Sequence, residues 1–438
     1  MLTLLGVVVF VLALVISVAW HELGHLIPAK LFKVPVSQYM VGFGPTIWSR
    51  RIGETEYGLK WILLGGYIRM IGMYRPDPSA KAAKRGWFRD LADAARENTR
   101  DEIAAAKADG QAVEGRSFYQ LSTPKKLVVM LGGPTMNLIL AVVFVAIAIS
   151  GVGGYGASTT IDEVARCVLT GEADATADDG GRAGGCGPGE ESGPAASAGV
   201  RPGDRVVAWD GDAIETWADV LAAVSGSGGV EAQLTVERAG RRIDLPVTPV
   251  KLTEPDGAAR PVIGITARAE LIRLPVWQAP AVVWEQIRAS AKLYAALPVS
   301  VWNTLADMVA GNERSQQSPI SVVGIARLSG EMAADPSLEQ VQDPWRIRWS
   351  TWLQLAGSVN IALWLFNLLP LLPLDGGHVA NALFEGCRRA WARLRRRPPP
   401  GPADSARLMP LTYLVVGALI LMTVILVVAD IVNPVRLS

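Results

Sequence analysis

The sequence predicts a polytopic α-helical membrane protein with about four transmembrane helices and one inserted α+β domain. Half of the 438 residues are hydrophobic and the mean hydropathy is +0.27, which is too apolar for an ordinary soluble protein. Long apolar runs alternate with polar segments, so sizeable aqueous parts are also expected. The formal net charge of +1 indicates no nucleic-acid partner.

The first predicted transmembrane helix covers residues 1–31. The run from Leu2 to Trp20 is continuously apolar apart from Thr3 and Ser17, and it is long enough to cross a hydrocarbon core of about 30 Å. A signal peptide is the alternative, but the run lacks a basic n-region and an A-x-A cleavage site. Cleavage there would remove or isolate the motif that follows, so we expect a retained span.

An HELGH motif ends this first run. His21 and His25 are four residues apart, so they share one face of a helix and can bind one zinc ion, with Glu22 as the general base between them. The alternative is a pair of buried structural histidines, which would be costly in a bilayer unless they bind a ligand or each other. The motif therefore predicts zinc-assisted hydrolysis.

Residues 32–126 are predicted to form a membrane-proximal strand loop and a polar helical insert. A β-prone apolar stretch surrounds Gly65 and Gly66, which suggests a hairpin close to the membrane. An exposed strand edge there could pair with an extended peptide, and Gly65 and Gly66 are therefore candidate substrate-binding residues; a purely structural hairpin is the alternative. The stretch from Asp77 to Gly115 is charged and predicts a solvated helix.

The second predicted span covers residues 127–152 and contains the sequence GGPTMN. Its small residues allow close approach of another helix. Asn137 places a polar group at membrane depth, where it either hydrogen-bonds a neighbouring helix or contacts substrate.

Residues 153–275 are predicted to form a compact α+β domain. A run of small residues and turns, GPAASAGVRPGD, precedes a helix-like stretch over 217–224 and strand-like alternation over 233–247. This order resembles a PDZ domain, and the resemblance implies binding of an extended peptide or C-terminus at a sheet edge. A packing domain that only limits access to the membrane site is the alternative.

Cysteine usage excludes one kind of metal site. The chain has only three cysteines, so a four-cysteine zinc site is impossible and any zinc ion must use the histidines. Cys167 and Cys186 flank a Gly- and Asp-rich insert, and whether they form a disulfide is left open by the sequence.

Residues 276–352 are predicted to be an amphipathic connecting region. Apolar and aromatic residues recur from Ala279 to Val309 among charged ones, which indicates a helix on the membrane or on the domain, and Pro298 is expected to break it.

The third predicted span covers residues 353–378 and ends in a Pro- and Gly-rich segment that should unwind it. Asp375 in this segment is the predicted third zinc ligand, and Asn367 is a polar donor nearby. His378 is a poorer candidate, because two histidines and one carboxylate already leave the open position that a catalytic zinc needs.

Residues 379–408 are predicted to be a basic loop, and residues 409–430 a fourth span. The loop is short and rich in arginine, so it should be cytoplasmic. This orientation puts the inserted domain outside. It also brings the HELGH motif and Asp375 to the same, cytoplasmic-side depth, as a shared metal site requires.

Together these motifs resemble the bacterial site-2 proteases, which are intramembrane zinc metalloproteases. The specific part is the pairing of HExxH in the first span with LDGG in the third, supported by GPxxN and the PDZ-like run. The resemblance implies Zn²⁺ as cofactor, an active site near the cytoplasmic side and an extracytoplasmic PDZ domain. It implies regulated intramembrane proteolysis of single-span proteins, commonly anti-sigma factors, after a first cut by another protease. It also implies that Asn367 holds the unwound substrate or stabilises its oxyanion.

Two other functions remain as alternatives. A membrane zinc peptidase that trims exposed termini, as prenyl-protein proteases do, would use a glutamate as third ligand, so the LDGG motif argues against it. A non-enzymatic PDZ-bearing adaptor would have no need for Glu22.

Overall fold

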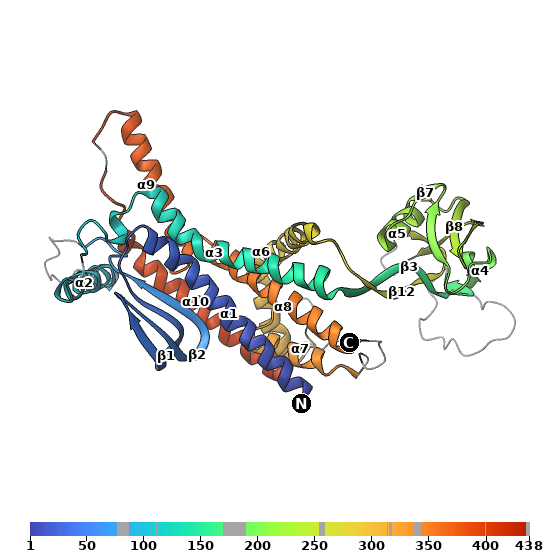
Figure 1. Cartoon of the computed structure of the whole chain (residues 1–438), viewed down its shortest axis with the longest axis horizontal. Helices are drawn as coiled ribbons and strands as arrows, with labels where there is room; N and C mark the ends of the chain where they lie inside the picture. Colours follow the sequence, from blue (N-terminus) through green and yellow to red (C-terminus); the bar gives the residue numbers. More distant parts are fainter. Residues whose placement is uncertain are drawn as a thin grey trace. The chain divides into compact units, whose positions relative to one another are not determined.

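The computed structural model describes residues 1–76, 87–110, 112–169, 190–253, 259–312, 314, 318–336, 338, 343–398 and 400–434. The chain divides into a helical unit, Met1–Val152 with Pro275–Ser438, and a sheet unit, Gly153–Leu274. Figure 1 shows the elements of both.

Three helices of the described chain are long and apolar enough to span a membrane. They are α1 (Leu2–Leu31), the helix Thr123–Val152 formed by α3 (Thr123–Ala146) and the π-helical η2 (Ile147–Val152), and α10 (Met409–Val432). Much of their apolar surface is exposed, as a lipid-facing helix requires. The chain is therefore a membrane protein with a separate sheet-containing unit.

The third predicted span corresponds to α8 (Pro344–Asn367), which begins nine residues earlier than expected. Polar residues such as Gln354 and Asn360 lower its hydropathy, and it is not among the three spanning candidates. The predicted unwinding is present, because α8 ends at Asn367 and the next helix begins only at Asp375. That α8 crosses the membrane stays a prediction.

Two predictions about these segments are wrong. The interval 379–408 is not all loop, because α9 (Asp375–Leu394) continues through its first half; arginine content indicates a side of the membrane and not a conformation. Pro298 does not break α6 (Ala279–Ala310), which runs through it. Contacts of α6 with α3, α8 and α10 explain why the loss of one backbone hydrogen bond is tolerated.

α1 and α3 approach each other unusually closely. A Cβ built on Gly24 would lie 2.3 Å from the carbonyl oxygen of Gly132, and one on Gly132 would lie 2.0 Å from that of Gly24. Only glycine fits at both positions, so the GGP sequence of α3 fixes this helix against the HELGH segment of α1.

The predicted strand loop is a long bent hairpin of β1 (Val36–Ile52) and β2 (Thr55–Met70). The first half of β1 pairs on both sides, with residues 56–59 and with residues 66–70 of β2. Residues 66–70 therefore form an edge of the sheet. The Tyr39 hydroxyl donates to the Ala19 carbonyl oxygen at 2.7 Å, which holds the sheet against α1 (Figure 1).

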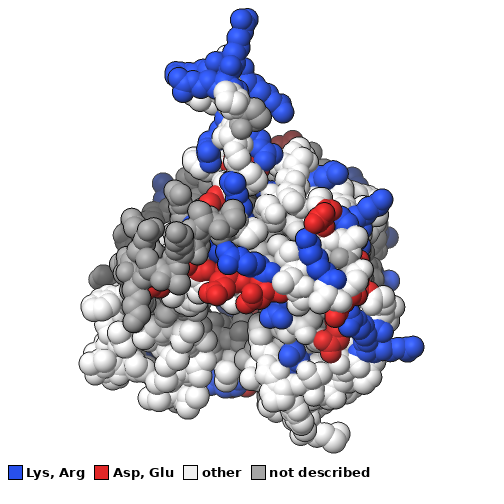
Figure 2. Space-filling model, turned by 90° about the vertical axis from the view of Figure 1, so that its left-hand side faces the viewer, with Lys and Arg blue, Asp and Glu red and all other residues white. Residues whose placement is uncertain are grey.

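The remaining helical elements lie around this framework. They are α2 (Trp87–Ala108), η1 (Phe118–Gln120), η3 (Val276–Gln278), α7 (Val322–Ala333) and η5 (Ser405–Leu408). Figure 2 looks onto the end of the helical unit that carries α2 and α9, where Lys and Arg side chains cover the projecting part.

The sheet unit contains a sheet of strand order β12-β3-β6-β8-β9, with β7 beside β6. Its predicted helix is α5 (Trp217–Gly226), and the predicted alternation over 233–247 is the hairpin of β8 and β9. Its other elements are β3 (Gly154–Val164), β4 (Cys167–Leu169), β5 (Glu190–Ser192), α4 (Pro194–Ser197), β6 (Arg205–Trp209), β7 (Asp212–Ala213), β8 (Ala232–Arg238), β9 (Arg241–Val247), β10 (Val250–Thr253), β11 (Ala259–Val262) and β12 (Ile265–Ile272).

The core of the sheet unit holds one buried carboxylate. Asp204 is 1% exposed, and its two oxygens accept hydrogen bonds from Arg238 at 2.7 Å and from the Arg201 backbone N–H at 2.8 Å. The sequence left open whether Cys167 and Cys186 form a disulfide, and Cys186 lies outside the described residues.

Candidate metal centre and catalytic cavity

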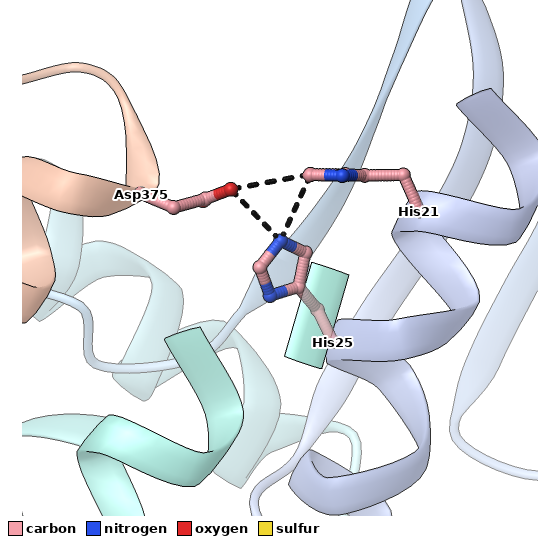
Figure 3. A group of neighbouring side chains, drawn as sticks. All are labelled: His21, His25 and Asp375. Atoms are coloured by element: carbon pink, nitrogen blue, oxygen red, sulfur yellow. Dashed lines mark hydrogen bonds and ion pairs between the residues drawn. The ribbon is translucent and has the colours of Figure 1, made fainter. Parts of the chain in front are cut away.

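Three side chains from distant parts of the sequence converge on one point. The Nε2 atoms of His21 and His25 are 3.1 Å apart, and each lies 3.2 Å from Oδ2 of Asp375. Figure 3 shows both rings leaving successive turns of α1 toward the carboxylate at the start of α9. These are the three residues that the motifs predict as metal ligands.

The spacing of these atoms fits a zinc ion. A tetrahedral zinc with bonds of about 2.0–2.1 Å has ligands about 3.3 Å apart, close to the separations seen here. Oδ2 of Asp375 is buried and accepts no hydrogen bond within the described structure. A Cβ on Gly133 would lie 2.2 Å from Nε2 of His25 and 2.7 Å from Nε2 of His21, so glycine keeps the space beside the ligands open.

α3 contacts the other ring nitrogen of each histidine. Nδ1 of His25 lies 2.8 Å from the Val129 carbonyl oxygen, and Nδ1 of His21 lies 3.1 Å from the Asn137 amide. A histidine that binds zinc through Nε2 is protonated at Nδ1, so each Nδ1 needs an acceptor. The Asn137 amide is placed with Nδ2 toward His21, and its Oδ1 is buried without a partner. With the amide rotated by 180°, Oδ1 accepts a hydrogen bond from Nδ1–H of His21.

Sequence reasoning missed the role of Val129, because a backbone carbonyl leaves no signature in the residue types. It left two roles open for Asn137. The structure brings Asn137, which is fully buried, into contact with His21.

The LDGG motif explains why Asp375 reaches the histidines. Added Cβ atoms on Gly376 and Gly377 would lie 2.2 Å from the Leu369 carbonyl oxygen and 2.5 Å from the Leu372 nitrogen. The two glycines therefore let segment 368–374 fold back onto the start of α9. Asp375 is the first residue of that helix, where a carboxylate is favoured by the helix dipole.

The three ligands line a cavity of about 440 Å³ together with the other predicted site residues. Those residues are Glu22, Gly65, Gly66, Asn137 and Asn367. His378 also lines it but is not one of the three converging groups. A Cβ on Gly66 would lie 3.1 Å from Cγ of Glu22, so the edge of β2 lies directly against the candidate base.

A larger cavity of about 740 Å³ is lined partly by Pro370, Leu372 and Gly377. Arginines 75, 96 and 388 line it, and none of the three metal donors does. The chemistry therefore belongs to the smaller cavity.

The helices, the histidine pair and the carboxylate define a membrane zinc metalloprotease. The model of peptidase family M50 matches residues 9–397, and the chain belongs to this family, the site-2 proteases. Family membership makes the chain an enzyme that uses Zn²⁺, and it removes the adaptor and the terminus-trimming peptidase from consideration.

Relatives carry matching names. The chain is 34% identical to the zinc metalloprotease Rip1 of Mycobacterium tuberculosis over the full length of both proteins. It is 31% identical to Rip1 of Mycolicibacterium smegmatis, with 98% of each chain covered. It is 27% identical to the metalloprotease MmpA of Caulobacter vibrioides, with 88% of this chain and 87% of that protein covered.

Proposed function

We propose that this zinc protease performs regulated intramembrane proteolysis of single-span membrane proteins that another protease has already shortened. Anti-sigma factors are the proposed substrate class. The observation that supports this proposal best is the cavity itself, which is lined by the three metal donors and Glu22 together with apolar residues of α1 and α8 and the glycines of β2.

Zinc held by His21, His25 and Asp375 would supply a Lewis acid that polarises the scissile carbonyl group. Glu22 takes a proton from the attacking water and later delivers it to the leaving amine. The side-chain amide of Asn367, which lines the same cavity, donates to the developing oxyanion or holds the unwound substrate.

Segment 66–70 of β2 aligns the substrate. A peptide bond in a helix is protected by its backbone hydrogen bonds, so the substrate must be extended before attack. An edge strand offers backbone groups for pairing with an extended peptide. Gly65 and Gly66 line the cavity without side chains, which leaves room for a peptide backbone next to Glu22.

The proposed topology has α8 as a fourth spanning helix and the arginine-rich end of α9 in the cytoplasm. The metal centre then lies near the cytoplasmic side and the sheet unit outside the cell. The sheet unit acts as a PDZ-like size filter, and its sheet edge is a candidate site for an extended peptide or C-terminus. Membrane lipid surrounds the helices, and no nucleic acid is involved.

Cleavage in liposomes tests the function. The test substrate is a tagged single-span protein trimmed to a short outer stub, and the same protein with its outer domain intact is the control. We expect the wild type to cut only the trimmed form, and Glu22→Gln to keep its zinc and lose cleavage. Full activity of Glu22→Gln would contradict the mechanism, and equal cutting of both substrates would contradict the size filter.

A further inference from the structure

We propose that an apolar groove beside the metal cavity binds the transmembrane helix of the substrate before a peptide bond reaches Glu22. This inference rests on the proposed function and adds the place where the substrate helix binds.

The groove has a volume of about 670 Å³ and lies within the helical unit. It is lined by residues of α1, α6, α7, α8 and α10, such as Phe10, Leu293, Ile325, Ala362 and Met422. None of its described lining residues is charged, and its few polar side chains are hydroxyl groups such as those of Ser290 and Ser300. A surface of this kind binds an apolar partner by close packing.

The groove adjoins the metal cavity. Leu14, Val322 and Leu363 line both spaces. On α1, Leu14 precedes His21 by seven residues, which is about 10 Å along a helix axis. On α8, Val359 lines the groove and Asn367, about 12 Å further along, lines the cavity. A helix in the groove therefore points its end at the catalytic groups.

The position of the groove beside the metal cavity favours a protein helix over a lipid chain as its occupant. A lipid chain needs an apolar surface alone, whereas the groove adjoins a cavity lined by Glu22, Asn367 and the edge of β2. Such an arrangement suits a substrate that is helical at one end and extended at the other. A lipid in the groove is thus an outcome that the experiment must be able to detect.

One wall of the groove is held by a buried ion pair. Nη1 of Arg314 lies 2.7 Å from Oδ1 of Asp430, and Oδ2 of Asp430 accepts a hydrogen bond of 2.6 Å from the Ser321 backbone N–H. Nη2 of Arg314 also donates to the carbonyl oxygen of Pro319, a wall residue, at 2.6 Å. Both charged side chains are almost completely buried, so the wall is held in place by α10.

Photo-crosslinking tests occupancy independently of cleavage. In Glu22→Gln protein, a benzoylphenylalanine at Leu293 or Ile325 should crosslink the transmembrane helix of the trimmed test substrate. The same group at Leu414 or Ile420, which are exposed on α10 and do not line the groove, is the control. Adducts of phospholipid alone at Leu293 and Ile325, or equal substrate crosslinking at the control positions, would overturn the proposal.

Narrowing the groove tests its use in catalysis. Ala362→Phe and Ser290→Phe should each lower kcat/KM for the trimmed substrate about tenfold or more, since a poorly fitting apolar site loses at least this much. Ala418→Phe, on the exposed face of α10, is the matched control and should cut normally. Zinc content confirms folding of each variant. Normal cleavage by both groove variants would overturn the proposal, whereas failure of the wild type to cut would contradict the proposed function instead.

Discussion

His21 and His25 each direct Nε2 toward the candidate metal position and Nδ1 toward α3. Val129 supplies a backbone oxygen to His25, and Asn137 supplies its amide to His21. These contacts select which nitrogen is free to bind zinc, so the metal site depends on α3 although α3 supplies no ligand.

Asn137→Ala should therefore lower zinc affinity about 10- to 100-fold, the usual cost of losing such a partner. Asn137→Asp should retain most of the affinity, because a carboxylate can still accept from Nδ1 of His21. Competition with a chelator measures both. Wild-type affinity in the alanine variant, or equal losses in both variants, would show that an acceptor at this position is not required.

At the residue scale, the sequence was sufficient to select candidate site residues whose side-chain type and spacing are typical of a zinc site. The convergence of His21, His25 and Asp375 was predictable from residue type and spacing, and the structure brings these three side chains together. Their role as zinc ligands and the role of Glu22 as the base stay predictions. The Val129 carbonyl was not predictable, because every residue has one and only the fold selects which of them faces a histidine.

Among the elements, α3 matters most for the site, because its residue Gly133 lies directly against both histidine rings. Gly133→Ala should reduce bound zinc at least tenfold, since its methyl group would displace the two histidine rings from their Zn–N distances. Gly417→Ala on α10 is the control, because an added Cβ there meets nothing within 4 Å. Zinc per chain, measured on purified protein, gives the result. Full zinc occupancy in Gly133→Ala would contradict the role of this glycine.

The position of α9 depends on a buried ion pair with α3. Lys126 donates to Glu385 at 2.8 Å, and Glu385 is 1% exposed. Among the described residues, Lys126→Met leaves the carboxylate with Arg389 as its one charged neighbour, and it should cost about 3 kcal/mol. Lys126→Met combined with Glu385→Met should be less destabilised than Lys126→Met alone. Thermal unfolding of the wild type, the two single variants and the double variant decides this, and additive losses would argue against coupling.

Elements with a local signature were predictable, and elements that depend on packing were not. The glycine-centred β pattern predicted the hairpin, and the Pro-Gly segment predicted the end of α8. The continuation of α6 through Pro298 was missed because contacts with three other helices outweigh one lost hydrogen bond. α9 was missed because its arginines were interpreted only in terms of topology.

At the scale of the whole molecule, the sheet unit should respond to acid through Asp204. Burial tends to raise the pKa of Asp204, but hydrogen bonds from Arg238 and Arg201 lower it below its ordinary value. Stabilisation by a carboxylate of lowered pKa is complete above its unfolded pKa, about 3.9, and is lost as the pH falls through the folded pKa. The protection of β6 and β8 amides against hydrogen exchange in the full chain, measured relative to the intrinsic exchange rate at each pH, should therefore fall below about pH 4.

Asp204→Asn separates this effect from general acid sensitivity. The variant should exchange faster at pH 7, by an amount equal to about 2 kcal/mol, and should show a smaller further change on acidification. An unchanged exchange rate at pH 7 would mean that the buried carboxylate does not stabilise the unit.

Orientation in the membrane is the property of the whole molecule on which the proposed function depends most. Cys387 on α9 is a free, exposed thiol next to the arginine cluster, so it reports the side of the membrane that this cluster occupies. If that side is cytoplasmic, a membrane-impermeant maleimide should label Cys387 only after the cells are permeabilised. In a Cys387→Ser background, Ser225→Cys on the exposed surface of α5 should be labelled in intact cells, with the background protein as control. The reverse pattern would place the metal centre near the outer face and the sheet unit in the cytoplasm. A cytoplasmic sheet unit could not screen the outer domains of substrates.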